Sequence, residues 1–137
     1  MIEKILHQNE ELAVIIRGSY TKEGVNFVTP ESYPLQVGVF CHKKDKVIKP
    51  HIHKDSVRTV NKVMEVLHIE HGKVDVAFYI NDSIVKTSIL EKGDTIILLS
   101  GGHGFNILED TKIIEVKQGP YLGQIEDKEL LSTEGEG

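Results

Sequence analysis

The sequence predicts an all-β fold of antiparallel strands, arranged as a small barrel or sandwich. Short runs rich in valine and isoleucine are bounded by clusters of glycine, asparagine, aspartate and serine, which is the pattern of strands joined by turns. Helical periodicity is nearly absent. From Gly72 onward, turn-forming clusters recur about every ten residues, which suits successive hairpins and leaves no room for long helical crossovers.

The strand prediction rests on runs of residues at 12–17 (LAVIIR), 35–41 (LQVGVFC), 73–80 (KVDVAFYI) and 94–100 (DTIILLS). The run at 73–80 alternates most clearly, because its even positions are valine, phenylalanine and isoleucine, whereas its odd positions include Lys73 and Asp75. One face of such a strand can be buried while the other meets water, as in an antiparallel sheet.

The length of 137 residues suits one domain. We expect that domain over residues 1–131, with N-terminal strands within 12–41 and the motifs that carry chemistry within 38–121. Hydrophobic residues make up 39% and charged residues 27% of the chain, which is typical of a globular protein. Residues 132–137 have little to bury, so we expect a mobile tail.

The composition also limits the classes of partner that the chain is expected to bind. The net charge of −5 and the scattered lysines argue against nucleic acid, since backbone binding needs clustered basic residues. No apolar run approaches the roughly 20 residues that cross a bilayer. Cys41 is the single cysteine, so an internal disulfide is excluded, and the N-terminal stretch carries charges where a signal peptide needs an apolar core. We expect a cytoplasmic protein that binds a small-molecule substrate.

Two histidines, His51 and His53, are the first candidate ligands of a metal. On a strand, residues two apart project from the same face, so both rings would approach one ion. An isolated pair of this kind is also common on protein surfaces without any function. His68 and His71 differ, because the first shares the outward face of its strand and the second precedes the turn at Gly72, so we expect both to be solvated.

Glu65 is the second candidate. It shares a strand face with Val63, Leu67 and Ile69, which places a carboxylate among apolar side chains. Removing this charge from water costs several kcal/mol unless it is paired. Glu65 is therefore either a metal ligand or one half of an ion pair with a lysine.

His103 follows a glycine pair at the end of an apolar strand. Gly101 and Gly102 allow a tight turn with positive φ, which would direct His103 back toward the interior of the sheet. The alternative is a surface histidine in a flexible loop.

Taken in order, these elements resemble the cupin superfamily, whose fold is an antiparallel double-stranded β-helix, also called a jelly-roll barrel. Its first motif, a glycine, H-x-H, a glutamate and a further glycine, is similar to Gly38, His51, His53, Glu65 and Gly72. Its second motif, a glycine, a turn and a histidine, is similar to Gly93, Gly101, His103 and Asn106. The resemblance covers about residues 38–121.

The resemblance implies a metal site made of His51, His53, Glu65 and His103, with positions left open for water or substrate. Mixed imidazole and carboxylate ligands suit iron, manganese, nickel, cobalt or zinc, and the sequence does not choose among them. The sequence departs from the family pattern in lacking a proline in the second motif and in the eleven residues that separate His53 from Glu65. This long span leaves Asp55 as a rival acidic ligand, although only Glu65 has the family spacing to its glycine.

Further side chains are candidates for substrate contact: Arg58, Lys62, Tyr79, Phe105 and Lys117. Arg58 and Lys62 lie in the long span, where they would meet an anionic substrate or belong to an ordinary solvated loop. The two aromatics would form a stacking wall or part of the core. Lys117 would reach into the barrel or take part in structural pairing.

We hypothesise a metal-dependent enzyme that acts on a small polar molecule, such as a carbohydrate or nucleotide sugar, by isomerisation, epimerisation or oxygenation. The chain loosely resembles small cupins of bacterial surface-polysaccharide pathways, which favours such a substrate. One alternative is a metal-free isomerase or epimerase in which His51 or His53 is the general base. Another is a binding module without catalysis. We also expect a homodimer, formed by pairing of the apolar run at residues 12–17.

Overall fold

The computed structural model describes residues 1–123 and 129–131. Within them the chain forms ten strands and no helix, and every strand pair is antiparallel. The all-β, antiparallel prediction is therefore confirmed. The expected mobile tail at residues 132–137 lies outside the described residues. No helix in the described ranges has the length and apolar character that a membrane span requires.

Contacts between residues divide the chain into two compact units, and each is described by itself. Unit 1 comprises residues 1–20 and 64–137, and unit 2 comprises residues 21–63. The expectation of a single domain over residues 1–131 stays a prediction.

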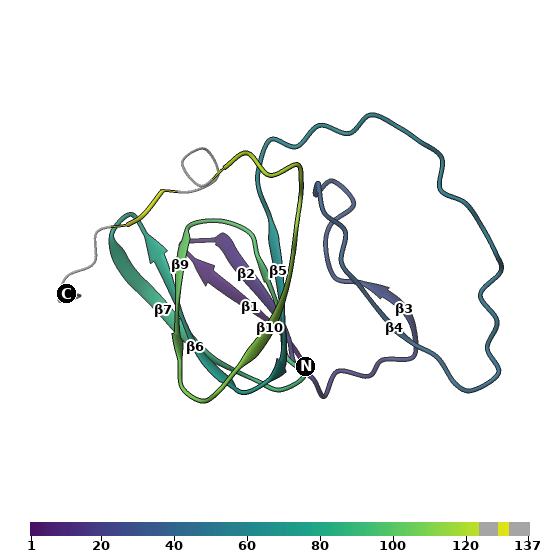
Figure 1. The fold of residues 1–137 in the computed structure, drawn as a ribbon, viewed down its shortest axis with the longest axis horizontal. Helices are drawn as coiled ribbons and strands as arrows, with labels where there is room; N and C mark the ends of the chain where they lie inside the picture. The colour runs from purple at the N-terminus through teal and green to yellow at the C-terminus, as the bar shows by residue number, and fades with distance from the viewer. Residues whose placement is uncertain (124–128, 132–137) are drawn as a thin grey trace. The chain divides into compact units, whose positions relative to one another are not determined.

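Unit 1 is built of two antiparallel sheets (Figure 1). Its strands are β1 (Ile2–His7), β2 (Glu10–Ile16), β5 (Glu65–His71), β6 (Lys73–Ile80), β7 (Ser83–Glu91), β8 (Thr95–Leu98), β9 (Gly102–Ile107) and β10 (Lys112–Lys117). One sheet has five strands in the order β1-β2-β8-β5-β10, and the other has three in the order β7-β6-β9. Strand β6 has the bounds predicted from its alternating pattern.

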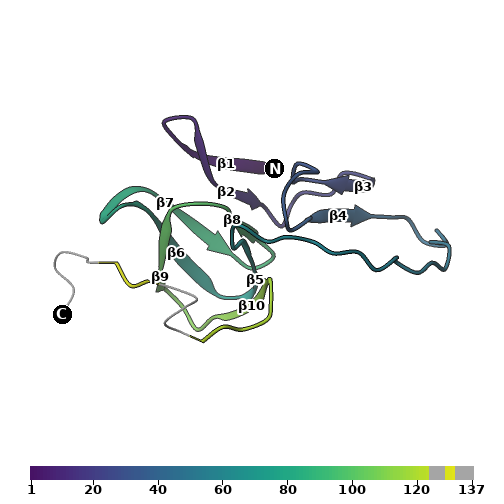
Figure 2. The same cartoon turned by 90° about the horizontal axis from the view of Figure 1, so that it is seen from above.

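From β5 onward, the strands of unit 1 form long arms that each run through both sheets. The arm β5–β6 pairs with β7–β8 along one side and with β9–β10 along the other. Gly72 and Gly93, with φ of 103° and 91°, lie where two of these arms bend from one sheet into the other. Unit 1 is thus a set of long antiparallel hairpins folded over at their bends (Figure 2).

The bend at Gly72 is closely packed. A Cβ atom at this position would lie 2.6 Å from the carbonyl oxygen of Asp110 and would also collide with Thr111, so no larger residue fits. Thr111 Oγ1 accepts a hydrogen bond from the backbone N–H of Lys73 at 3.2 Å and donates one to the carbonyl of Glu109 at 2.8 Å. The bends of the arms β5–β6 and β9–β10 are therefore fastened together.

The hydrophobic core of unit 1 contains side chains from both sheets: Ile5, Leu12, Ala13, Ile15, Leu67, Ile69, Val74, Val76, Phe78, Leu90, Ile96 and Leu98. Burial of each large side chain contributes roughly 1.5–3 kcal/mol. Tyr79 belongs to the opposite face of β6, yet it is also buried. It lies opposite Gly102 of β9, and a Cβ atom at Gly104 would be in ordinary van der Waals contact with its ring, at 3.6 Å.

A polar network fastens the N-terminal strands to the bend between β7 and β8. Arg17 donates to both carboxylate oxygens of Glu3 at 3.1 Å and to Oδ2 of Asp94 at 2.9 Å. The buried Asp94 carboxylate also accepts from the backbone N–H groups of Gly18 and Glu91. The hydrogen bond to Glu3 is the largest influence that raises the pKa of Arg17, against a smaller opposing effect of burial.

The run at residues 12–17 is not a free edge. Strand β2 lies between β1 and β8 in the five-stranded sheet, and the side chains of Leu12 to Ile16 are buried. Its backbone groups are therefore already paired on both sides, so the predicted pairing of this strand with a partner chain is wrong. Among the described strands, β1 is at the end of this sheet.

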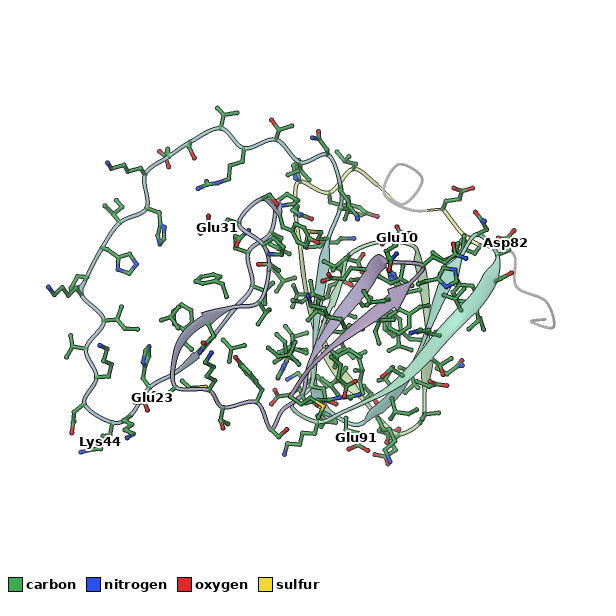
Figure 3. All side chains as sticks on the ribbon, turned by 180° about the vertical axis from the view of Figure 1, so that it is seen from behind. Glu10, Glu23, Glu31, Lys44, Asp82 and Glu91 are labelled. Atoms are coloured by element: carbon green, nitrogen blue, oxygen red, sulfur yellow. The ribbon has the colours of Figure 1, made fainter. Side chains whose placement is uncertain are left out.

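Unit 2 contains one hairpin, formed by β3 (Gly24–Phe27) and β4 (Gly38–Cys41). Figure 3 labels Glu23 and Lys44 near one end of this hairpin and Glu31 in the connection at the other end, and it labels Asp82 and Glu91 at the two ends of β7 in unit 1. Residues 42–64 are described throughout and contain no strand.

Candidate functional site

Glu65 and His103 meet across the two sheets of unit 1. Glu65 opens β5 and His103 is near the start of β9, and their Oε2 and Nε2 atoms are 3.4 Å apart. Both side chains face the core, because Leu67 on the same face of β5 is buried and His103 is paired in register with the buried Phe78. This contact places a carboxylate and an imidazole at one end of the space between the sheets.

The pair is partly withdrawn from water but still reachable. The exposed fraction of the side chain is 20% for Glu65 and 30% for His103. A carboxylate in such a place needs a partner, as its position among Leu67 and Ile69 predicted. Val63, which was expected on the same buried face, is 50% exposed and precedes the strand.

The turn before β9 directs His103 inward, as its glycines predicted. Gly101 has φ of 73°, and a Cβ atom there would lie 2.7 Å from the carbonyl oxygen of Tyr79. Both the backbone conformation and the lack of space therefore require glycine at this position. Gly102 has no positive φ, and a Cβ atom there would meet the side chain of Leu131.

Two further predicted residues lie beside this pair. Phe105, two residues after His103, packs against the core, and the centroids of the two rings are 5.6 Å apart. Lys117 of β10 is directly opposite Glu65 in the strand register. The structure thus brings together Glu65, His103, Phe105 and Lys117, whereas Tyr79 packs on the other face of its sheet.

Gln118 was not found by the sequence reasoning. Its side-chain oxygen accepts a hydrogen bond from the backbone N–H of Met64 at 2.9 Å, directly before Glu65. Its Nε2 atom is buried and has no hydrogen-bond partner among the described residues. Gln118 therefore fixes the start of β5, and no motif in the sequence indicated this.

His51 and His53 form a second pair, within unit 2. Their ring centroids are 5.2 Å apart at an angle of 70°, and Nδ1 of His51 is 2.8 Å from the carbonyl oxygen of Lys49. The expectation that they lie on a strand is wrong, since no strand includes them. Both side chains are exposed, as are the other candidates in the same irregular segment, Asp55, Arg58 and Lys62.

His68 and His71 belong to neither pair. Nδ1 of His68 is 2.8 Å from Oγ1 of Thr95 and its Nε2 is 3.9 Å from Glu70, with 40% of the side chain exposed. His71 is exposed at the end of β5. These contacts lie on the outward face of the sheet, in agreement with the alternation along β5.

The donor atoms of the two pairs are of the kind that divalent transition metals bind, namely imidazole nitrogen and carboxylate oxygen. Within the described parts of the chain, no group of three or more histidine, cysteine, aspartate or glutamate residues is close enough to hold an ion. Each pair is thus a partial donor set in its own unit.

Comparison with known proteins adds no relative. No family model, no curated protein and no solved structure matches the chain. A function therefore has to be argued from the residues and their geometry.

Proposed function

We propose that the chain is a metal-binding protein of the cupin type, in which Glu65 and His103 are ligands of a divalent transition metal. We further propose that it is an enzyme acting on a small polar molecule, such as a carbohydrate derivative. The observation that carries the proposal is the contact of Glu65 with His103, because the two residues lie on different sheets and belong to different motifs.

The architecture of unit 1 supports the finer fold assignment, a double-stranded β-helix. A jelly roll consists of two antiparallel sheets connected as Greek keys. In unit 1, β5, β8 and β10 belong to one sheet, whereas β6, β7 and β9 belong to the other. Consecutive strands therefore change sheets at the bends, which a simple meander within one sheet does not do.

A bound metal would polarise a substrate oxygen or lower the pKa of a bound water. Glu65 and His103 contribute one carboxylate oxygen and one imidazole nitrogen from a framework of paired strands. Phe105 provides an apolar surface next to His103, which limits the access of water on that side.

The test is the metal content of untagged protein, purified and then supplemented with manganese, iron, cobalt, nickel or zinc. Glu65→Gln and His103→Ala should each lower the metal content sharply. Glu70→Gln is the matched control, because Glu70 lies on the same strand but is exposed on its outward face. Absence of stoichiometric metal in the wild type would overturn the proposal. A loss in Asp55→Asn but not in Glu65→Gln would show that the acidic ligand is Asp55.

A second candidate is a metal-free isomerase or epimerase. The 3.4 Å contact favours His103 as its general base, in place of His51 or His53, because a neighbouring carboxylate orients the imidazole ring. Turnover of nucleotide sugars that survives exhaustive chelation and is lost in His103→Gln would support this candidate. Turnover that stops on chelation and returns with added metal would favour the metal-dependent enzyme.

A further inference from the structure

We propose that residues 42–63, called the basic segment below, bind the surface of a lipid membrane that carries anionic headgroups. The segment belongs to unit 2, follows β4 in the chain and contains no strand and no helix (Figure 1). Every residue in it is exposed. It takes no part in the proposed function, since it contains neither Glu65 nor His103.

The basic segment carries positive charge in an acidic chain. It holds seven of the sixteen lysines and arginines but only two of the twenty-one acidic residues. With histidine counted as neutral, its net charge is +5, whereas that of the whole chain is −5. Such an asymmetry is typical of a segment that meets an anionic surface. The basic residues are thus less scattered than the composition of the whole chain suggested.

Most of these positive charges are not compensated within the described residues. Lys43 is 4.0 Å from Glu23 and Lys44 is 3.6 Å from Asp45, but both pairs are exposed, and exposed pairs contribute little. Among the described residues, the other five basic side chains of the segment form no ion pair: Lys46, Lys49, Lys54, Lys62 and Arg58. The last two are the ones predicted to meet an anionic substrate. All five are available to a partner that brings negative charge.

Aliphatic side chains are interspersed with these charges and are also exposed. The exposed fraction is 92% for Ile52 and 99% for Val57. Four more aliphatic residues of the segment are at least 44% exposed: Val47, Ile48, Val60 and Val63. Single exposed apolar residues are normal on a protein surface, whereas a group of them marks an interaction site. The partner should therefore offer an apolar environment as well as negative charge.

This combination favours a membrane over a nucleic acid. The phosphate groups of a nucleic acid would attract the lysines, but they would leave the aliphatic side chains in water. At a membrane interface, lysines meet the anionic headgroups while aliphatic side chains enter the boundary of the acyl chains. Only the membrane satisfies both kinds of side chain.

The backbone of the basic segment determines how deeply it can enter. No strand ladder satisfies its N–H and C=O groups, so these need water or headgroups as partners. Unpaired backbone groups do not enter the hydrocarbon layer. The segment therefore lies at the level of the headgroups, with only its aliphatic side chains inserted.

The experiment is co-sedimentation of the full chain with lipid vesicles. One set of vesicles contains phosphatidylcholine and phosphatidylserine in equal parts, and the other contains phosphatidylcholine alone. The chain should bind the anionic vesicles at least about tenfold more tightly. Added salt should weaken this binding, because salt screens exposed charges. Equal binding to both sets of vesicles, or no binding to either, would overturn the proposal.

Variants test the two kinds of side chain separately. Each lysine or arginine near an anionic leaflet contributes about fivefold to the affinity. Lys46→Gln, Lys49→Gln and Arg58→Gln together should therefore lower the affinity for anionic vesicles about 100-fold. Ile52→Ser combined with Val57→Ser should lower it at least about fivefold, because less apolar surface is inserted.

The matched controls carry the same substitutions on exposed positions of unit 1. Lys4→Gln, Lys86→Gln and Lys112→Gln together are the control for charge. Ile84→Ser combined with Ile107→Ser is the control for apolar surface, since these side chains are 55% and 57% exposed. Both controls should bind anionic vesicles with an affinity within about twofold of the wild type. Circular dichroism shows whether each variant is folded.

Three further outcomes would refute the proposal. The first is a decrease in the controls as large as in the variants of the basic segment. The second is unchanged vesicle binding when Ile52 and Val57 are replaced by serine, which would show that the segment acts by charge alone. The third is tighter binding to a DNA duplex than to anionic vesicles, which would identify a nucleic acid as the partner instead.

Discussion

Replacing Asp94 by alanine should lower the free energy of unfolding by about 3–5 kcal/mol, because this carboxylate is buried and accepts several hydrogen bonds. Its oxygens accept from the backbone N–H groups of Gly18 at 2.9 Å and Glu91 at 2.8 Å and from Arg17 at 2.9 Å, with 9% of the side chain exposed. Alanine leaves the two backbone donors unpaired, at about 1–3 kcal/mol each. Arg17 keeps Glu3 as a partner, which limits its share of the loss.

The assay is urea unfolding followed by circular dichroism, and the comparison is with an exposed ion pair. Lys4 and Glu11 are 3.9 Å apart, and 61% of the Lys4 side chain is exposed. Lys4→Met should therefore change the free energy of unfolding by less than about 1 kcal/mol. A loss below about 1 kcal/mol in Asp94→Ala, or one no larger than in Lys4→Met, would refute the role assigned to Asp94.

Gly101→Ala should lower the free energy of unfolding by at least about 1 kcal/mol more than Gly93→Ala does. Both glycines have positive φ, but only at Gly101 would the new Cβ atom lie 2.7 Å from the carbonyl oxygen of Tyr79. Equal decreases for the two variants in the urea assay would contradict this. The pKa of Arg17 is raised, chiefly by Glu3, and a group with a raised pKa stabilises the fold at any pH below its unfolded pKa. The decrease in the free energy of unfolding caused by Arg17→Met should thus stay constant from about pH 7 to 10. A decrease that becomes smaller as the pH rises over this range would argue against this account of Arg17. We also expect a homodimer, and light scattering that shows a monomer at micromolar concentration would exclude it.

The strands of unit 1 were predictable where burial alternates with exposure. In β6 the even positions Val74, Val76 and Phe78 are fully buried, and the strand has its predicted bounds.

The position of β2 in its sheet was not predicted, and the reason can be identified. An unbroken apolar run is typical of a strand buried on both faces, which is an interior strand rather than an edge. The five consecutive buried residues of β2 fit that rule.

The candidate site was predictable in part. Alternation along β5 and the glycines before His103 were sufficient to point both Glu65 and His103 toward the core. The prediction of a strand at His51 and His53 was wrong because the surrounding sequence is poor in strand-forming residues. Pro50 lacks the backbone donor that a strand ladder needs, and charged residues flank the histidines on both sides. A spacing of two residues therefore placed two imidazoles together without producing a strand.

The contact between Glu65 and His103 also depends on the bend at Gly72. From the sequence, Gly72 was predicted only as the turn that ends a strand. His103 is paired in register with Phe78, at the opposite end of the arm that begins with Glu65. At about 3.3 Å per residue, a straight arm would separate positions 65 and 78 by roughly 40 Å. The bend folds β6 over β5, so that the end of β6 faces the start of β5 across the core. His103, which is paired with that end of β6, then lies with its Nε2 atom 3.4 Å from Oε2 of Glu65. Gly72 is remote from the site in sequence, yet the positive φ and the lack of space at this residue determine whether the two halves of the site can meet.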